Sequence, residues 1–243
     1  MAGHSKWAKI KRQKAGNDAK RGAEFTRLGN AIAIAAKGGG DPSMNPTLAL
    51  AVEKAKAANM PNANIDKAIK RGTGELGGDI IEEYLFEGYG PGGVGIIVEA
   101  ASDNRNRTTT EIRTAFNKNG GNMAESGSVA FQFTRKGVIT VKASGEDALL
   151  TILDAGADDA TEEDGEIVVY TDMKQLGAVR DAIKEAGLEV ADAELQYVPN
   201  STIDVTESDQ AKKIMKIMDA IEELDDVVNT FSNFDIAEDV SIE

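Results

Sequence analysis

The sequence of 243 residues contains no cysteine and a single histidine, His4. Without cysteine the chain can form no disulfide framework, no thiolate nucleophile and no zinc–thiolate site. A lone histidine near the N-terminus, with no second histidine or cysteine to orient it, is a poor general acid or base. These absences favour a protein that is not an enzyme and that works in a reducing compartment. We expect it to be cytoplasmic and to use no cofactor and no metal.

Long apolar runs are also absent. The longest one, residues 94–101, has the length of a strand, whereas a membrane-spanning helix needs about 20 residues. The N-terminal residues MAGHSKWAKIKRQK lack the apolar segment of a secretory signal. We therefore expect no membrane association. Apolar residues still make up 41% of the chain, enough to bury real cores, and the length favours two or three domains.

The charge of the chain is divided unevenly. Residues 1–71 hold 14 Lys and Arg against 5 Asp and Glu, a net charge of +9. The other 172 residues hold 13 basic and 36 acidic side chains, a net charge of −23. An asymmetry of this size predicts that the basic end meets a nucleic acid, while the acidic remainder is repelled by phosphate.

Within the basic end, the first 30 residues form the strongest candidate site. Trp7 lies in this arm, where it can stack on a base or anchor the arm to the helical core. Lys70 and Arg71 end a predicted helix, where they either extend the basic surface or interact with the helix dipole. The basic side chains of the arm that we predict to contact phosphate are Lys6, Lys9, Lys11, Arg12, Lys14, Lys20, Arg21 and Arg27.

Helical periodicity dominates residues 1–75. Apolar residues recur at helical spacing within three segments, which are separated by Gly38-Gly39-Gly40 and by Met60-Pro61. The predicted helices cover residues 17–37, 46–59 and about 64–71. We therefore predict that residues 1–75 form a basic, all-helical domain.

The rest of the chain alternates strand and helix patterns, which predicts an α+β fold. Strands at 80–87, 94–101 and 128–134 enclose a helix at 107–119. The next segments read strand 138–142, helix 146–155, strand 157–163, strand 166–171, helix 173–186 and strand 189–198. That order, βαββαβ, is the ferredoxin-like split unit. A strand near Ile203, a helix at 208–224 and a strand at 226–232 follow.

Two α/β ferredoxin-like domains explain this order of elements. We predict that residues 79–134 and 202–243 form one discontinuous domain, and that residues 135–201 form a second domain inserted into it. Three domains in series are the alternative.

Two motifs imitate known sites. Gly88-Tyr89-Gly90-Pro91-Gly92-Gly93 satisfies G-x-G-x-x-G, but a strand pattern follows it where a dinucleotide site needs a helix, so we predict a hairpin turn. The acidic cluster at residues 158–166 lacks the spacing of an EF-hand loop, and we interpret it as a solvated acidic face.

A second candidate contact with nucleic acid lies at Arg105 and Arg107, in the segment Asn104–Arg107 before a predicted helix. The same segment can simply begin that helix. Phe131 and Phe133 alternate as the stacking aromatics of an RNA-binding sheet do, but their neighbours do not fit the RNP1 pattern. We expect both phenylalanines to be buried.

Four segments together resemble the YebC/PmpR family over the whole length of the chain. They are MAGHSKWAKIKRQKAGNDAKRG (1–22), ANMPNANIDKAIKRGTGE (58–75), YGPGGVGIIVE (89–99) and NGGNMAESGSVAFQF (119–133). The resemblance implies a helical N-terminal domain followed by two α/β domains, one inserted in the other. It also implies a regulator of gene expression without enzyme activity, described in some members as a DNA-binding transcriptional regulator.

Other members of this family look like translation factors that act on ribosomes stalled at proline-rich stretches, and one is a mitochondrial translational activator. The short third helix offers few side chains for reading DNA bases, whereas a basic arm with an aromatic suits irregular RNA. DNA and ribosomal RNA, with the ribosome itself as a partner, therefore both remain open. The sequence identifies no protein partner for the acidic domains.

Overall fold

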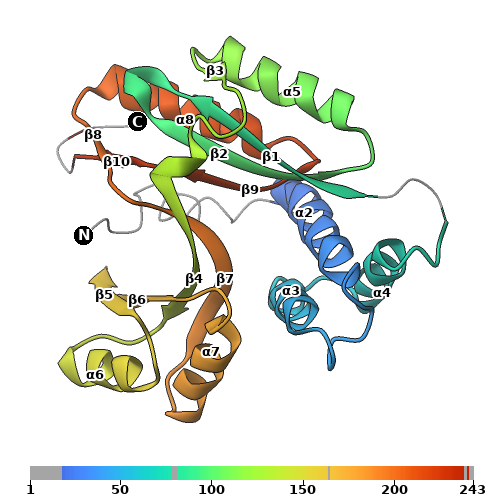
Figure 1. Cartoon of the computed structure of the whole chain (residues 1–243), viewed down its shortest axis with the longest axis vertical. Coiled ribbons are helices and arrows are strands. Elements are labelled where there is room, and N and C mark those ends of the chain that lie inside the picture. Colours follow the sequence, from blue (N-terminus) through green and yellow to red (C-terminus); the bar gives the residue numbers. More distant parts are fainter. Residues whose placement is uncertain (1–17, 78–80, 164, 238–239, 241–243) are drawn as a thin grey trace. The chain divides into compact units, whose positions relative to one another are not determined.

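A computed structural model describes residues 18–77, 81–163, 165–237 and 240 (Figure 1). The side chains of residues 18–21 and 23 lie outside this description. One compact unit is formed by Phe133–Asn200, and the other by the described residues up to Gln132 together with those from Ser201 on. Helices at the N-terminal end are followed by an α/β region with two four-stranded antiparallel sheets.

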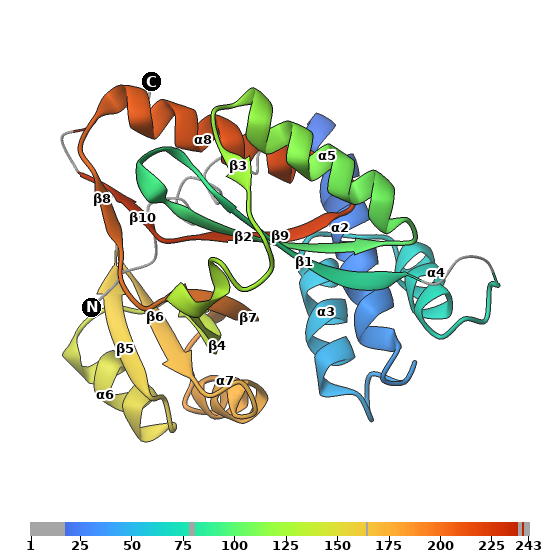
Figure 2. The same ribbon diagram turned by 45° about the horizontal axis from the view of Figure 1, so that its top comes forward.

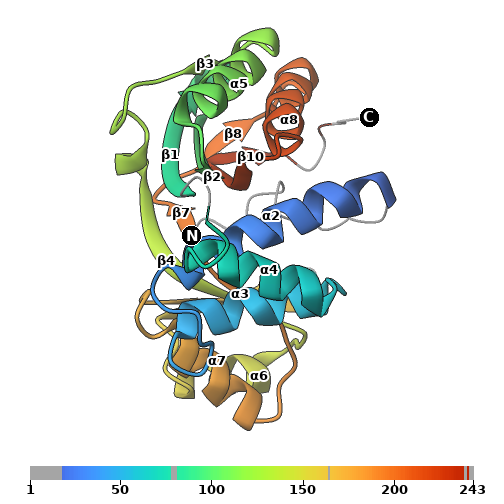
Figure 3. The ribbon, with the colours of Figure 1, turned by 90° about the vertical axis from the view of Figure 1, so that its right-hand side faces the viewer.

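Three helices form the described portion of the N-terminal part, and they lie side by side in Figure 3. The Asn45 side chain accepts the amide of Leu48 and starts the second helix, with Pro46 in its first turn. Asn59 adopts a left-handed conformation (φ 60°) and ends that helix. Their shared core includes Ile32 and Leu48, both fully buried. The helices are α2 (Asp18–Ala36), α3 (Pro46–Ala57) and α4 (Asn62–Gly72).

The first sheet has the strand order β3-β1-β2-β9 and is covered on one face by two helices (Figure 2). Ile96 and Val98 point from the sheet into the core beneath these helices, where they meet Phe116 and Ile214. The strands are β1 (Glu82–Tyr89), β2 (Gly95–Ser102), β3 (Asn122–Met123) and β9 (Val227–Ser232), and the helices are α5 (Arg105–Lys118) and α8 (Ser208–Glu222).

The opposite face of this sheet meets the N-terminal helices. Ala33 of α2 packs with Ile81 and Ala101 in a small buried cluster. Central strand β2 is therefore buried on both sides, which explains why its sequence does not alternate and is apolar except at Glu99 and Ser102. A short parallel pair, β8 (Ile203–Val205) and β10 (Phe234–Ile236), completes this unit.

The second sheet has the strand order β5-β6-β4-β7, and all its strand pairs are antiparallel. Its chain path is the βαββαβ order predicted from the sequence, and this strand order is that of the split βαβ unit. The elements are β4 (Phe133–Val141), α6 (Glu146–Asp154), β5 (Asp159–Glu163), β6 (Glu166–Thr171), α7 (Leu176–Glu185) and β7 (Val190–Pro199). In the first sheet, by contrast, β1 joins β2 directly as a hairpin.

Two predictions about elements are wrong, and two short strands were missed. Within the predicted strand at 128–134, residues 128–132 form a turn and a 3-10 helix, η2 (Ala130–Gln132), and only residues 133–134 are strand, as the start of β4. The predicted break between 134 and 138 does not exist, because β4 runs through Arg135, Lys136 and Gly137 as one strand. Strands β3 and β10 were not predicted, since segments of two and three residues show no periodicity.

Candidate nucleic-acid interface

Most of the predicted basic arm lies outside the described residues. This applies to Lys6, Trp7, Lys9, Lys11, Arg12 and Lys14, and also to His4. Lys20 and Arg21 belong to α2, but their side chains are not described either. Their contacts with nucleic acid therefore stay predictions. The described part of the candidate interface begins at Arg27.

Arg27 lies on α2 and is half-buried. Its Nε atom is shielded from solvent and has no hydrogen-bond partner among the described residues. A buried donor without an acceptor is rare, and it costs about 1 to 3 kcal/mol relative to a paired one. This guanidinium is therefore an unusual feature that packing among the described residues does not explain.

Arg71 lies in the last turn of α4 and is exposed. Its Nη1 atom donates to Oδ1 of Asn30 on α2 at 3.2 Å. Asn30 is only 5% exposed, and its Nδ2 atom donates to the carbonyl oxygen of Asp225 at 3.2 Å. The two hydrogen bonds fix the orientation of the Asn30 amide, which in turn holds Arg71 beside α2.

Gly72 allows α4 to approach α2 this closely. A Cβ atom at this position would lie 2.1 Å from the carbonyl oxygen of Ala33, a distance that no side chain can adopt. Lys70 and Arg71 therefore end α4 at its contact with α2 and are exposed there. Both readings from the sequence, a basic surface and a favourable position for the helix dipole, are compatible with this placement.

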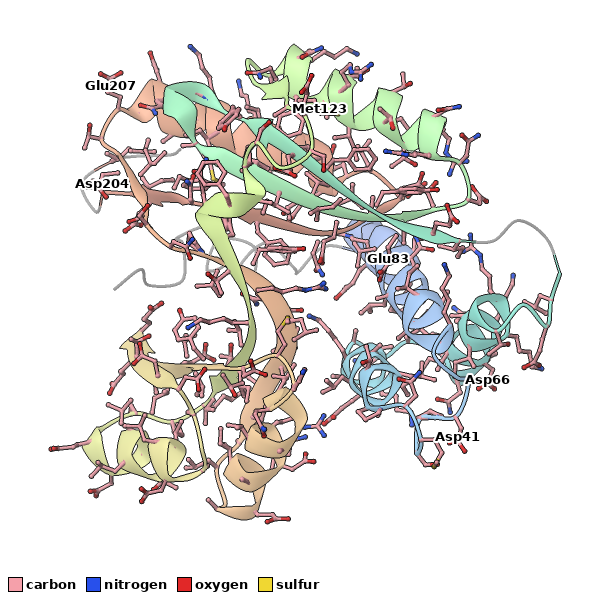
Figure 4. The ribbon with its side chains drawn as sticks, viewed as in Figure 1. Asp41, Asp66, Glu83, Met123, Asp204 and Glu207 are labelled. Atoms are coloured by element: carbon pink, nitrogen blue, oxygen red, sulfur yellow. The ribbon has the colours of Figure 1, made fainter. Side chains whose placement is uncertain are left out.

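Helix α4 carries three basic side chains, Lys67, Lys70 and Arg71, and one acidic side chain, Asp66. All four are exposed, and Figure 4 shows Asp66 on this helix. The buried face is formed by Ile65 and Ala68. The surface of α4 is thus cationic, as the charge of residues 1–71 predicted.

Arg107, part of the second candidate contact, is bound within the protein. Asp226 accepts from its Nη2 atom at 2.8 and 3.0 Å and from its Nε atom at 3.3 Å. These bonds, and the charge of Asp226, raise the pKa of Arg107. The Asn104 side chain accepts the Arg107 amide at 3.1 Å and caps α5. The segment therefore starts a helix, and a contact of Arg107 with nucleic acid stays a prediction.

Arg105 lies over the ring of Tyr84, with 5.6 Å from the guanidinium carbon to the ring centroid. The Tyr84 hydroxyl donates to Glu82 at 2.8 Å, and this bond raises the pKa of Tyr84. Arg105 is exposed, so a contact with nucleic acid remains a prediction for it.

Sequence reasoning missed the role of Glu87. This residue is 2% exposed, and its carboxylate accepts three backbone amides: Gly127 at 2.6 Å, Val129 at 2.6 Å and Ala130 at 2.8 Å. A buried carboxylate thereby replaces the strand partner that residues 127–130 lack. Nothing in the sequence pattern around Glu87 indicated this contact, which joins residues about forty positions apart.

Glu87 also decides where Phe131 lies. Phe133 is buried, as predicted, but Phe131 is 73% exposed, so the prediction of its burial is wrong. The carboxylate of Glu87 holds the segment in a 3-10 turn rather than in a strand. The alternation of Phe131 and Phe133 therefore does not correspond to one face of a sheet.

The G-x-G-x-x-G segment and the acidic cluster both take part in contacts that support the fold. Residues 88–93 form the tight connection between antiparallel β1 and β2, in which the Gly90 amide donates to the Val94 carbonyl at 2.8 Å, so the predicted hairpin turn is confirmed. In the acidic cluster, Glu162 accepts the Gly145 amide at 2.8 Å. Within the described ranges no group of three or more acidic, His or Cys side chains is arranged to hold a metal ion.

None of the described helices is long and apolar enough to span a membrane.

Two family models match this chain. The model described as "TACO1/YebC protein N-terminal domain" matches residues 5–75, and "TACO1/YebC second and third domain" matches residues 81–234. The chain belongs to the TACO1/YebC family. The N-terminal TACO1/YebC match covers the three helices that carry Arg27, Lys70 and Arg71. The second match covers both four-stranded sheets.

Individual TACO1/YebC relatives are similar over nearly the whole chain. Proteins from Halothermothrix orenii (49% identity over 246 residues) and Syntrophomonas wolfei (47% over 247 residues) each carry the name "Probable transcriptional regulatory protein". The alignments cover 99% of this chain and 97% and 98% of the relatives. The crystal structure of a conserved hypothetical protein from Aquifex aeolicus matches with a TM-score of 0.86 and 42% identity, covering 92% of this chain and 93% of that one.

Proposed function

We propose that this protein is a non-enzymatic, nucleic-acid-binding regulator of gene expression that acts on DNA in transcription. The observation that carries the proposal is the charge division, a net +9 over residues 1–71 against −23 over the remainder. A polyanion attracts the first part and repels the second, so the protein approaches it with the N-terminal helices in front. The names of the relatives, transcriptional regulatory proteins, support the choice of transcription.

Helix α4 is short, but its exposed face adds polar and basic side chains to the end of the protein that we propose meets DNA. Asn64, Lys67 and Arg71 are spaced so that they share one exposed face of this helix. Asn reads the edge of adenine through paired hydrogen bonds, and both Lys and Arg contact phosphate. Because the relatives come from bacteria, where transcription occurs in the cytoplasm, we expect this activity to be cytoplasmic.

A matched pair of charge reversals tests the proposal. In one variant Lys9, Lys11 and Lys14 of the arm are changed to Glu, and in the control Lys212, Lys213 and Lys216 of α8 are changed to Glu. Both remove three positive charges and add three negative ones. We expect the arm variant to lose DNA binding in footprinting and fluorescence anisotropy, and the control to retain most of it. Equal losses would mean that net charge alone governs binding.

Ribosomal RNA is the second candidate target. Trp7, an aromatic residue among the basic side chains of the arm, favours this target, because irregular RNA is bound through stacking on unpaired bases and through phosphate contacts. Crosslinking the protein in cells and sequencing the attached nucleic acid separates the two candidates. Promoter DNA supports the proposed function, whereas ribosomal RNA and cosedimentation with ribosomes support a translation factor.

We also propose a three-domain organisation for this function. Residues 1–75 form the basic helical domain, residues 79–134 with 202–243 a discontinuous α/β domain, and residues 135–201 a ferredoxin-like domain inserted into it. The pairing of β2 with β9 supports the discontinuous domain, and the separate sheet of Phe133–Asn200 supports the insertion. Expression of residues 135–201 alone tests it, since an independent domain should fold cooperatively.

A further inference from the structure

Arg27 is a half-buried cation with a buried N–H donor that has no acceptor among the described residues. Its Nε atom is buried without an acceptor, and no described residue forms an ion pair or hydrogen bond with its guanidinium. The chain holds 41 Asp and Glu residues, so acidic partners are abundant in the sequence. A buried donor without an acceptor lowers stability and calls for an explanation, such as a bound ion or ligand.

Arg71 reaches the same stretch of α2 from another helix. Arg27 and Asn30 are three positions apart on α2, which places them on neighbouring turns of one helix face. The Nη1 atom of Arg71 donates to Oδ1 of that same Asn30 at 3.2 Å. Arg71 makes no contact with a carboxylate among the described residues. Arg71 thus binds the buried amide of Asn30, Arg27 lies one turn before that amide on α2, and no carboxylate among the described residues pairs with either guanidinium.

We propose that Arg27 and Arg71 form a phosphate-binding site at the junction of α2 and α4. The site takes one phosphodiester group of the nucleic-acid backbone. The proposal rests on the proposed function and adds to it a defined contact point within the folded part of the chain. The guanidinium group matches phosphate because its N–H donors lie in one plane and bind two oxygens at once.

The surrounding contacts keep the site in place. Asn30 is held by the Asp225 carbonyl, which follows α8 and precedes β9. Gly72 lets the end of α4 touch α2, so Arg71 is positioned by the packing of two helices. A phosphate bound here has a fixed register against α2 and α4, whereas a contact made by a long side chain alone fixes no register.

Affinity measurements on the full chain test the site. The variants are Arg27→Met and Arg71→Met, and the control is Lys56→Met, which removes one exposed charge from α3. Binding to labelled duplex DNA and to labelled single-stranded RNA is followed by anisotropy over a range of salt concentrations. We expect each arginine variant to weaken binding about tenfold and to reduce the slope of log affinity against log salt by about 0.7 to 0.9. The control should change affinity by less than about threefold.

Thermal stability separates a binding role from a structural one. Methionine fills nearly the same space as the arginine stem and removes the unpaired buried donor. We therefore expect Arg27→Met to melt at the same temperature as the unchanged protein, or higher, while it binds nucleic acid more weakly. A lower melting temperature with unchanged affinity would show that Arg27 serves the fold, and the proposal would be wrong.

Two further outcomes distinguish this proposal from the proposed function. If the arm variant loses binding but both arginine variants behave like Lys56→Met, the site does not exist while the proposed function stands. If the unchanged protein binds neither DNA nor RNA, both proposals fail. Weaker capture of an acidic protein, with nucleic-acid affinity unchanged, would assign the two arginines to a carboxylate partner and overturn the phosphate site.

Discussion

Asp226 and Arg107 form a two-point ion pair that joins the first residue before β9 to the first turn of α5, with Nη2–O distances of 2.8 and 3.0 Å. The same carboxylate accepts the hydroxyls of Thr108 at 2.6 Å and Ser102 at 2.9 Å. Its side chain is 12% exposed, whereas that of Arg107 is 47% exposed. Asp226 is thus the buried centre of a polar network that connects β2, α5 and β9.

Replacing Asp226 should destabilise the protein in a pH-dependent way. Burial by itself would raise the pKa of Asp226, but hydrogen bonds from Thr108, Arg107 and Ser102 outweigh this effect, so the pKa lies below its ordinary value. We expect Asp226→Asn to lower the free energy of unfolding by about 2 kcal/mol at neutral pH, as measured by urea denaturation. The control Asp103→Asn should cost less than about 0.5 kcal/mol, because its contact with Arg107 is partly exposed.

The stabilisation that Asp226 provides should be lost in acid. A carboxylate whose folded pKa is depressed stabilises the protein above its unfolded pKa of about 3.9, and this stability is lost as the pH falls through the folded value. The difference between the unchanged protein and Asp226→Asn should therefore shrink below about pH 4. A constant difference down to pH 2 would show that the charge of Asp226 is not the source of the stabilisation.

Glu87→Gln should release the segment that precedes β4. A glutamine side chain offers one acceptor oxygen where the carboxylate serves the amides of Gly127, Val129 and Ala130 with two. We expect hydrogen exchange of these amides to accelerate at least tenfold and the free energy of unfolding to fall by about 2 kcal/mol. Glu83→Gln, an exposed change on the same strand (Figure 4), should alter neither measurement.

Gly72→Ala should disrupt the packing of α4 on α2. The added Cβ would lie 2.1 Å from the Ala33 carbonyl oxygen and 2.8 Å from the Ala36 side chain, so the helices must separate. We expect a loss of about 2 kcal/mol or more in thermal unfolding. Gly29→Ala on α2 is the matched control, because its Cβ would meet only Met60 at 3.6 Å. This control should be neutral or stabilising by up to about 1 kcal/mol.

Tyr170 should be the last tyrosine to ionise. Burial, together with the charges of Glu163 and Asp159, raises its pKa to about 12. A raised folded pKa gives stability that is complete below the unfolded value of about 10 and is lost as the pH rises towards 12. Tyr170→Phe should therefore flatten the loss of stability between pH 10 and 12 and remove the latest step in the tyrosinate absorbance. Tyr197→Phe on β7, in the same unit, should leave that latest step in place.

Periodicity predicted the long elements well because each one buries a single face. Helix α8 was expected from Ile214, Ile217, Met218 and Ile221, all of which are buried. The βαββαβ order of β4 to β7 was likewise readable, since each element carries its own apolar pattern. The predicted strand at 128–134 failed because its backbone is paired with a carboxylate of β1, and no local pattern encodes such a contact.

Part of the candidate interface could likewise be predicted from the sequence, and part of it depends on the fold. The positive charge of residues 1–71, and with it the predicted affinity for a polyanion, is a property of composition that needs no coordinates. Nothing in the sequence around Arg107 and Arg27 indicates which of the two has a carboxylate partner. The fold decides this. Asp226, far along the chain, neutralises Arg107, whereas no described carboxylate reaches Arg27. An ion pair depends on distances of a few ångströms between remote residues, and only the packing of helices and sheets sets those distances.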